Sequence, residues 1–210
     1  RIAEYTRACG KEAPMDEPKQ NDRRIQIETA AYGLLSLKGY KATSMLEVAK
    51  RAKASNETLY KWYGNKQGLF LSMVERSVAA SRELLVSSLE GDQDLATILD
   101  TFGPQLLQML TSQRTIVLNR AAAGDVHDTG MLGRTINEGG RDAILPILAQ
   151  VFDRSEPKGM TGYEAAELYL DILISDLQIR RVIGVLPMLS ETEVKARSDR
   201  ARDIVLKLIA

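Results

Sequence analysis

The sequence predicts an all-α protein of about nine helices, with a small N-terminal domain of three helices and a larger C-terminal helical domain. Three observations support this fold class. Apolar residues recur at three- and four-residue spacing from Arg24 almost to the end of the chain, and no segment alternates as a strand would. Short Gly, Pro and polar stretches separate these segments. The chain has 210 residues, 44% of them hydrophobic, which is enough to bury a core.

Charge is divided unevenly along the chain. Lys and Arg number 28, as do Asp and Glu, so the whole molecule has no bulk attraction for nucleic acid or an anionic membrane. Residues 19–66, however, hold ten basic and four acidic side chains, a net charge of +6, which leaves −6 for the rest. This asymmetry is typical of a chain in which one part meets a polyanion. Charge alone leaves an alternative open, in which the uneven charge belongs to a solvated surface that binds no polyanion.

Residues 1–20 mix charges with Pro14 and Pro18 and carry no apolar stripe, which predicts a flexible arm. They lack the apolar core of a signal peptide, and no stretch of the sequence reaches the roughly 18 apolar residues of a membrane span. Cys9 is the only cysteine, which excludes an internal disulfide and a Cys-based zinc site. We therefore expect a cytoplasmic protein without a membrane partner.

The N-terminal domain is predicted over residues 21–67. Its first helix begins at Arg24 and ends at Gly39, where the apolar stripe stops. Ser44 and Glu47 have the spacing of a capping box, which predicts the start of a short second helix.

A tight turn is predicted between this second helix and a third one. The second helix ends near Ala52, and Lys53-Ala54-Ser55 then interrupts the periodicity. Ser55 is placed to cap the third helix, which ends before Gly64. Three side chains of the third helix are predicted to pack in the core rather than to stack on bases: Leu59, Trp62 and Tyr63.

The C-terminal domain is predicted over residues 68–210. Asn65 can cap a long helix that runs from the first domain toward Gly91. Beyond it the helical period continues, with no convincing strand and no repeat. The predicted helices cover residues 93–112, 114–124, 131–153, 161–186 and 190–209.

The segment from Thr43 to Phe70, TSMLEVAKRAKASNETLYKWYGNKQGLF, resembles the DNA-binding signature of the tetracycline-repressor (TetR) family. In that signature a Gly-aromatic pair precedes a Thr/Ser-capped helix, an Ala-rich helix end and a turn. Leu-Tyr-x-aromatic-aromatic follows, and a Lys opens the next helix. The C-terminal half resembles the AefR-like subgroup. The matching residues are Gly39-Tyr40, Thr43-Ser44, Ala49 to Ala52, Leu59-Tyr60, Trp62-Tyr63 and Lys66.

The resemblance implies a bacterial transcription regulator, by default a repressor, whose helix-turn-helix domain binds double-stranded operator DNA. It implies phosphate contacts by Thr43, Ser44, Tyr60 and Lys66. The string Ser-Asn-Glu-Thr at 55–58 agrees, because it places small polar groups at the helix end that normally reaches base edges. The candidate DNA-binding residues are Thr43, Ser44, Ser55, Asn56, Glu57, Thr58, Tyr60, Lys61 and Lys66.

Two positions depart from the family pattern. Lys53 stands where the family has its turn glycine, so the turn must form without the residue best suited to a left-handed conformation. Glu57 places a carboxylate in the proposed recognition helix, where phosphates repel it unless it accepts a hydrogen bond from cytosine N4. Base reading, solvent exposure and pairing with Lys61 are all left open for Glu57.

The two last predicted helices favour a homodimer. Apolar residues cover more than one face of the helix near 161–186, as packing within and across a subunit boundary requires. The resemblance also implies dimerisation through this helix and the one at 190–209. Two-fold symmetry would place two recognition helices on half-sites about one turn, roughly 34 Å, apart, on a palindromic operator. The heptad-like stripe of the last helix consists of Val194, Ala201, Ile204, Val205 and Leu208.

The resemblance further implies an apolar pocket among the fifth to eighth helices, where a small-molecule effector would shift the DNA-binding domains and release DNA. No resident cofactor is expected. Aromatic and Met side chains are the candidate lining, and ordinary core packing is the alternative for them. The candidates are Phe102, Met109, Met131, Phe152 and Tyr169.

Metal and catalytic sites are not predicted. Asp125 and Asp128 could join His127, the only histidine, on a metal ion, but a solvated loop histidine is the favoured interpretation. No nucleophile with a nearby base is visible, and Gly139-Gly140 lacks the spacing of a phosphate loop. A helical ligand carrier and a DNA-binding scaffold partnered by another protein are the alternatives to a ligand-responsive regulator.

Overall fold

The computed structural model describes residues 17–210, and this range holds eleven α-helices and no strand. The predicted all-α fold class is confirmed. Two of the nine expected helical segments are each divided in two, which accounts for the higher number. The helices are α1 (Glu17–Ala42), α2 (Met45–Ala52), α3 (Asn56–Tyr63), α4 (Lys66–Glu90), α5 (Leu95–Thr111), α6 (Gln113–Asp125), α7 (Met131–Gly139), α8 (Arg141–Asp153), α9 (Gly162–Ile174), α10 (Leu177–Val182) and α11 (Glu191–Ile209).

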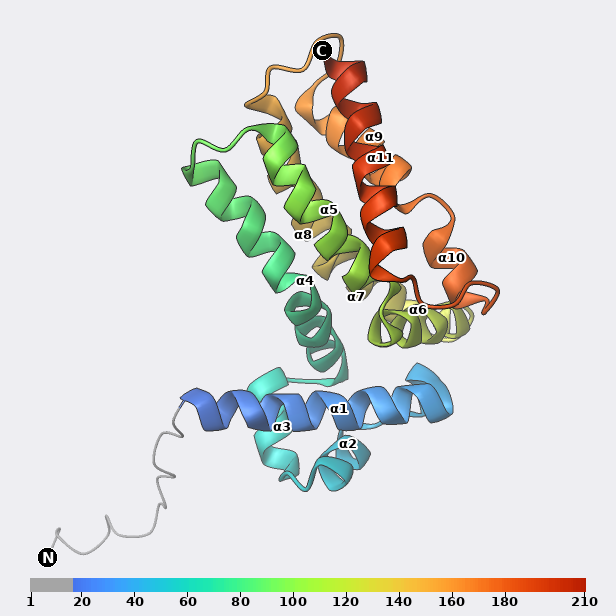
Figure 1. Ribbon diagram of the computed structural model, residues 1–210. Helices are drawn as coiled ribbons and strands as arrows, with labels where there is room; N and C mark the ends of the chain where they lie inside the picture. Colours follow the sequence, from blue (N-terminus) through green and yellow to red (C-terminus); the bar gives the residue numbers. More distant parts are fainter. Residues whose placement is uncertain (1–16) are drawn as a thin grey trace, which may run out of the picture.

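Figure 1 shows two groups of helices joined by α4. α1 lies across the base of the molecule with α2 and α3 beneath it, and α4 rises from this group into the second one. There α4 packs on α5, α7 and α8, α9 packs on α8, and α11 packs on α5 and α9. α6 returns to contact α1, so the two groups meet at α6 as well as at α4.

α1 begins earlier than predicted and bends near its end. Cys9 and most of the predicted arm over residues 1–20 lie outside the described residues, but the last of that stretch already belongs to α1. At Gly39 the backbone has φ 74° and ψ −179°, a conformation that residues with a side chain rarely adopt. The predicted end at Gly39 is therefore a break, after which a short last turn reaches Ala42.

The turn between α2 and α3 forms as predicted, without glycine. Lys53 adopts the left-handed conformation, with φ 51° and ψ 38°. Its N–H donates to the carbonyl of Lys50 at 3.2 Å, and the N–H of Ala54 donates to that of Ala49 at 2.9 Å. These bonds satisfy carbonyls at the end of α2, as a glycine cap would.

A first core joins α1, α2, α3 and the start of α4, and it also receives residues from α6 and α7. Leu59 and Tyr63 are buried in it, as predicted, whereas Trp62 is only partly buried. The rings of Tyr40 and Phe70 meet edge to face, with centroids 5.2 Å apart, which fixes the bent end of α1 against α4.

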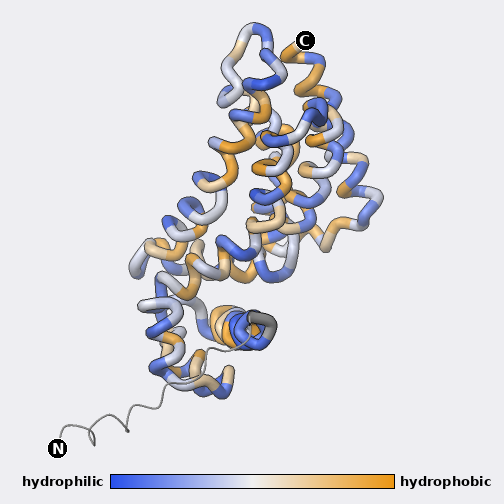
Figure 2. Tube along the Cα trace, turned by 90° about the vertical axis from the view of Figure 1, so that its left-hand side faces the viewer, coloured by the Kyte–Doolittle hydropathy of each residue, from blue (hydrophilic) through white to orange (hydrophobic). Residues whose placement is uncertain are grey.

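A second core lies between α4, α5, α8, α9 and α11. Phe102, Phe152 and Tyr169 are each 0% exposed at its centre. Figure 2 shows apolar and polar residues alternating along these helices, as expected when each buries one stripe. α4 supplies both cores, because its first turns belong to the first core and Val78 and Leu85 to the second.

Two predicted helices are interrupted. The segment predicted over 131–153 turns at Gly139-Gly140, where glycine weakens the helix enough for α8 to leave in a new direction. The segment predicted over 161–186 is divided at Ser175, whose φ of 45° and ψ of −129° are not helical. α9 and α10 therefore present separate faces to their neighbours.

α11 buries much of its apolar stripe against helices of its own chain. Val194, Ala201 and Val205 are buried against α5 and α9. Leu208 of the predicted stripe is 53% exposed. Dimerisation through this helix stays a prediction, supported by the outward part of the stripe and not by the buried part.

Candidate nucleic-acid interface and internal cavity

The N-terminal end of α3 is exposed and held in shape by its own residues. Ser55 caps the helix by accepting the N–H of Thr58 at 2.9 Å, and the two hydroxyl oxygens lie 2.7 Å apart. Asn56 and Glu57 are exposed, and within the described part of the chain neither has a hydrogen-bond or ion-pair partner. Glu57 therefore does not pair with Lys61 here, so base reading and solvent exposure remain for its carboxylate.

Exposed cations occur on α3 itself and on α2, the helix before it. Tyr60 is 49% exposed, and Lys61 next to it is exposed as well. On α2 and the following turn, Lys50, Arg51 and Lys53 are also exposed. A helix tip with free polar groups, flanked by a tyrosine hydroxyl and cations, is the arrangement expected of a surface that meets a duplex.

The hydroxyls of Thr43 and Ser44 form hydrogen bonds at the ends of α1 and α2. Thr43 is 2% exposed, and its Oγ1 donates to the carbonyl of Gly39 at 2.8 Å. Ser44 is exposed and forms the predicted capping box, with its Oγ 2.7 Å from Oε2 of Glu47. Lys38 bonds the same carboxylate, and this bond with that of Ser44 lowers the pKa of Glu47 to about 2. Phosphate contact by Ser44 is open, but the hydroxyl of Thr43 points into the protein.

Lys66 is turned toward α1 and not toward solvent. Its Nζ donates to the carbonyl of Tyr40 at 2.9 Å and lies 4.1 Å from the centroid of the Tyr40 ring. Partial burial lowers the pKa of this ammonium. The first residue of α4 therefore holds the end of α1, where an ammonium compensates unpaired carbonyls. Its phosphate contact stays a prediction.

Two arginines of α1 that sequence reasoning missed fix α2 and α3. Arg23 donates to the carbonyl of Ala52 at 3.1 Å and to that of Lys53, so it secures the turn. The guanidinium of Arg24 lies 5.5 Å from the centroid of the Trp62 ring. Both contacts join residues about thirty positions apart or more, and no local pattern predicts such pairs.

A buried carboxylate lies where α1, α4 and α6 meet. Glu28 is 5% exposed, and its Oε1 lies 3.0 Å from Nε of Arg76 on α4. Burial raises the pKa of Glu28, and the charges of Arg76, Arg114 and Arg24 partly offset this rise. Arg114 of α6 also lies over the ring of Tyr32, one turn further along α1. This cluster ties the first group of helices to both α4 and α6.

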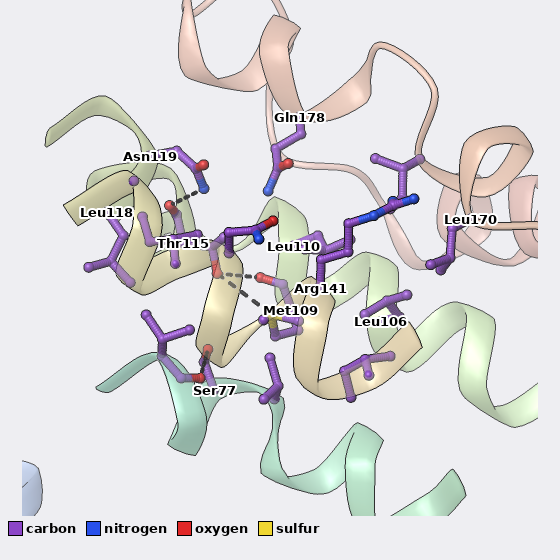
Figure 3. Close-up of a pocket in the computed structure, with 18 residues that line it drawn as sticks. Ser77, Leu106, Met109, Leu110, Thr115, Leu118, Asn119, Arg141, Leu170 and Gln178 are labelled. Atoms are coloured by element: carbon purple, nitrogen blue, oxygen red, sulfur yellow. Dashed lines mark hydrogen bonds between the residues drawn. The ribbon is translucent and has the colours of Figure 1, made fainter. Parts of the chain in front are cut away.

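A cavity of about 350 Å³ lies in the C-terminal domain, within the size range of small-molecule sites. Figure 3 shows its lining, which comes from every helix from α4 to α10. Ten of the lining side chains are aliphatic or thioether groups. The lining residues are Val74, Ser77, Val78, Leu106, Met109, Leu110, Thr115, Leu118, Asn119, Gly133, Ile136, Asn137, Gly140, Arg141, Ile144, Leu170, Ile174 and Gln178.

Of the five predicted lining residues, Met109 alone borders this cavity. Phe102, Phe152 and Tyr169 instead pack on one another, with the Tyr169 ring centroid 6.4 Å from that of Phe102 and 6.0 Å from that of Phe152. Met131, at the start of α7, is 40% exposed. These four residues do not line this cavity, because helical spacing identifies an inward face and not whether that face meets a neighbour or a void. Their contact with an effector stays a prediction.

His127 belongs to no cluster of three or more metal-ligating side chains in the described part of the chain. It is exposed in the turn after α6. Oδ2 of Asp125 accepts the hydroxyl of Thr129 at 2.6 Å and the N–H of Leu132 at 3.3 Å. Asp128 pairs with Lys41 at 2.6 Å. No cluster of three or more metal-ligating side chains occurs over residues 17–210, and no helix in that range is long and apolar enough to span a membrane.

Two family models match the chain. The model described as "Bacterial regulatory proteins, tetR family" matches residues 27–73, and the model described as "AefR-like transcriptional repressor, C-terminal domain" matches residues 97–208. The chain therefore belongs to the TetR family of bacterial regulatory proteins. The first range contains α2 and α3, and the second contains most of the helices around the cavity.

Individual relatives agree with this family. The HTH-type transcriptional regulator YdeS of Bacillus subtilis (strain 168) is 30% identical over 112 residues, which are 53% of this chain and 54% of that protein. The chain spans about half the length of the curated relatives it matches.

Solved structures share the whole fold. A TetR transcriptional regulator from Agrobacterium tumefaciens is 27% identical, with a TM-score of 0.67 over 92% of this chain and 95% of that one. The flavonoid-responsive regulator FrrA is 24% identical, with a TM-score of 0.65 over 89% and 96%. At that identity the likeness to FrrA is one of fold alone.

Proposed function

We propose that this protein is a DNA-binding transcriptional regulator, acting as a repressor in the cytoplasm. The observation that carries the proposal is the exposed tip of α3, where the side chains of Asn56 and Glu57 have no partner among residues 17–210 and Tyr60 and Lys61 follow on the same helix. Capping by Ser55 and the turn at Lys53 hold this tip in place. Binding to DNA therefore does not have to bear the entropic cost of ordering it. Family membership supports the same function.

The regulator binds a palindromic operator as a homodimer through α9, α10 and α11, the helices predicted at 161–186 and 190–209. Exposed apolar side chains on or next to these helices support this part of the proposal, because burying them against a second copy removes them from water. They are Tyr163, Ile179, Ile183, Val185, Met188 and Leu208.

A small apolar or amphipathic effector occupies the cavity and releases the protein from DNA. The size and largely apolar lining of the cavity support this step. They favour a ligand-responsive regulator over a scaffold without an effector. The name of FrrA states that this protein of like fold responds to flavonoids. The proposal contains no catalytic step and no resident cofactor.

The first test is a gel shift with the full chain and the DNA upstream of its own gene, at several salt concentrations and with a random duplex as competitor. We expect a shift that resists the competitor and weakens as salt rises, because phosphate contacts release counterions. Lys61→Glu should abolish it, whereas Lys158→Glu, the same change in the exposed loop between α8 and α9, should not. A shift that the random duplex removes equally well would contradict operator-specific binding.

A further inference from the structure

The cavity has an uneven charge. Of its lining residues, only Arg141 is ionised, and no carboxylate borders the cavity. The other polar side chains are neutral hydroxyls and amides. Among the lining side chains an anion finds one cation and no carboxylate, and the only carboxylate that it must displace is that of Glu167, which pairs with Arg141 from outside the lining.

Arg141 already holds a carboxylate that can be exchanged. One of its terminal nitrogens lies 2.9 Å from Oε1 of Glu167 on α9, and Glu167 does not line the cavity. The two side chains are 41% and 42% exposed, and ion pairs this open to solvent contribute little to stability. A ligand carboxylate can replace Glu167 and adopt the bidentate geometry that guanidinium groups favour, in place of the single contact that Glu167 makes.

The position of Arg141 adds to the attraction for an anion. It is the first residue of α8, and the N-cap, Gly140, has no side chain to accept the free N–H groups of that turn. Asp142 in the same turn is exposed, accepts from Nδ2 of Asn137 at 2.7 Å and does not line the cavity.

The hydroxyls of the lining are already bonded to the protein. Ser77 donates to the carbonyl of Val74 at 2.7 Å, and Thr115 donates to that of Met109 at 2.7 Å. Gln178, by contrast, has no hydrogen-bond partner within residues 17–210. Figure 3 shows it pointing toward the cavity from α10. It can accept or donate a bond to a polar group of a ligand.

The apolar part of the lining faces these polar groups. Seven of the ten apolar side chains in the lining come from α4, α5 and α9. Figure 3 shows Leu106 and Leu170 near the side chain of Arg141. A ligand that satisfies both parts carries an apolar body and one anionic group.

We propose that the effector of this protein is an amphipathic carboxylate, whose anionic group displaces Glu167 from Arg141 while its apolar body fills the space between α4, α5 and α9. This inference rests on the proposed function, in which the cavity holds the effector. It adds the charge of the effector and the residue that selects it.

The test compares acids with their uncharged amides by isothermal titration calorimetry on the full chain. The probes are octanoate, 4-phenylbutanoate and indole-3-butyrate, each paired with its primary amide, so that size and shape are matched. We expect at least one acid to bind, and to bind tenfold or more tightly than its amide. Equal affinity within every pair, tighter binding of the amides, or no binding of any acid would overturn the proposal.

Three variants test which residue selects the acid over its amide. Arg141→Gln should weaken acid binding at least tenfold and leave amide binding unchanged. Glu167→Gln should tighten acid binding, because it removes the competing carboxylate. Arg82→Gln, the same loss of charge on an exposed part of α4, should change neither. If Arg141→Gln does not fold, as judged by circular dichroism, the Glu167→Gln result decides, and unchanged or weaker acid binding there contradicts the proposal.

A parallel gel shift separates this inference from the function on which it rests. Specific DNA binding without acid preference would overturn the inference alone. Acid preference without specific DNA binding would overturn the regulator and leave the carboxylate site standing. Release of DNA by an acid at concentrations that saturate the cavity, with no release by its amide, is the outcome that we expect.

Discussion

The two groups of helices carry their functional residues in opposite ways. In the first group, candidate DNA-binding side chains such as Asn56 and Glu57 lie at an exposed helix end, and Ser55 caps that end through a contact within three residues. In the second group, the cavity is bordered by seven helices, α4 to α10, and no two or three neighbouring residues define it. Local rules therefore specify the DNA-facing surface, whereas only the packing of the whole domain specifies the cavity.

The largest expected effect comes from removing an aromatic ring from each core. Phe70→Ala and Phe102→Ala each delete a ring that is 0% exposed, which costs about 3–5 kcal/mol. We expect Phe70→Ala to abolish specific DNA binding, and Phe102→Ala to weaken the binding of cavity ligands more than that of DNA. Urea denaturation gives the stability change, and gel shift and calorimetry give the two activities. If both variants lost both activities equally, the division between the two groups would not hold.

The next effect concerns the cluster that joins the groups. Arg76→Met leaves the buried carboxylate of Glu28 without its nearest cation, and we expect a loss of about 1–3 kcal/mol in the free energy of unfolding. Arg82→Met, on the same helix but exposed, should change it by less than about 0.5 kcal/mol. Equal losses in the two variants would indicate that the ion pair has no special role.

Glu28 also predicts a dependence on pH. Because burial raises its pKa above the ordinary 4.5, the folded protein holds this proton more tightly than the unfolded chain does. Stability from Glu28 is therefore present at low pH and lost as pH rises above about 4.5. We expect the difference in free energy of unfolding between Glu28→Gln and the wild type to shift in favour of Glu28→Gln between pH 4.5 and 7. A constant difference over that range would contradict the raised pKa.

Substitutions at Asn56 and Tyr60 distinguish a residue that reads bases from one that contacts phosphates. Asn56→Ala should alter sequence preference by about 1–3 kcal/mol at one base pair, because a lost base contact affects only its own position. Tyr60→Phe should weaken binding to all sequences alike and by less. Anisotropy titrations against single-base operator variants measure both. Uniform losses in the two variants would remove Asn56 from the reading residues.

The smallest effect concerns the turn between α2 and α3. Lys53→Gly should raise the free energy of unfolding by up to about 1 kcal/mol, because a side chain at φ 51° is strained and glycine is not. Lys53→Ala keeps the strained backbone and removes the charge, so it serves as the control for salt-dependent effects. If alanine stabilised as much as glycine, charge and not backbone strain would be the cause.

Sequence alone predicted the first group well because its signals are local. The caps at Ser44, Ser55 and Asn65, the break at Gly39 and the left-handed turn at Lys53 all follow from neighbouring residues. The contacts that it missed are distant in sequence. Glu28 with Arg76, and Lys66 with the end of α1, form only when helices assemble.

In the second group the sequence predicted the helices but not which of their side chains line the cavity. Met109 was identified and Arg141 was not, because only aromatic and Met side chains were considered as lining candidates. The apolar periodicity also did not predict the break at Ser175, where the polar pair Ser175-Asp176 lies between two apolar runs. Which inward face meets a void depends on helices from α4 to α10 at once, and no single periodicity contains that information.

The continuity of α4 has a consequence for protein engineering. Leu69, Phe70 and Met73 belong to the first core, and Val74 and Ser77, in the very next turn, border the cavity. A chimera joined between residues 67 and 68 would cut through one core and combine halves from different parents. A graft that carries the donor through Met73 keeps α1 to α3 together with the α4 residues of that core other than Val74, and it leaves every cavity-lining residue to the recipient. A sensor with a new operator and an old effector can therefore be built by a junction within one helical turn.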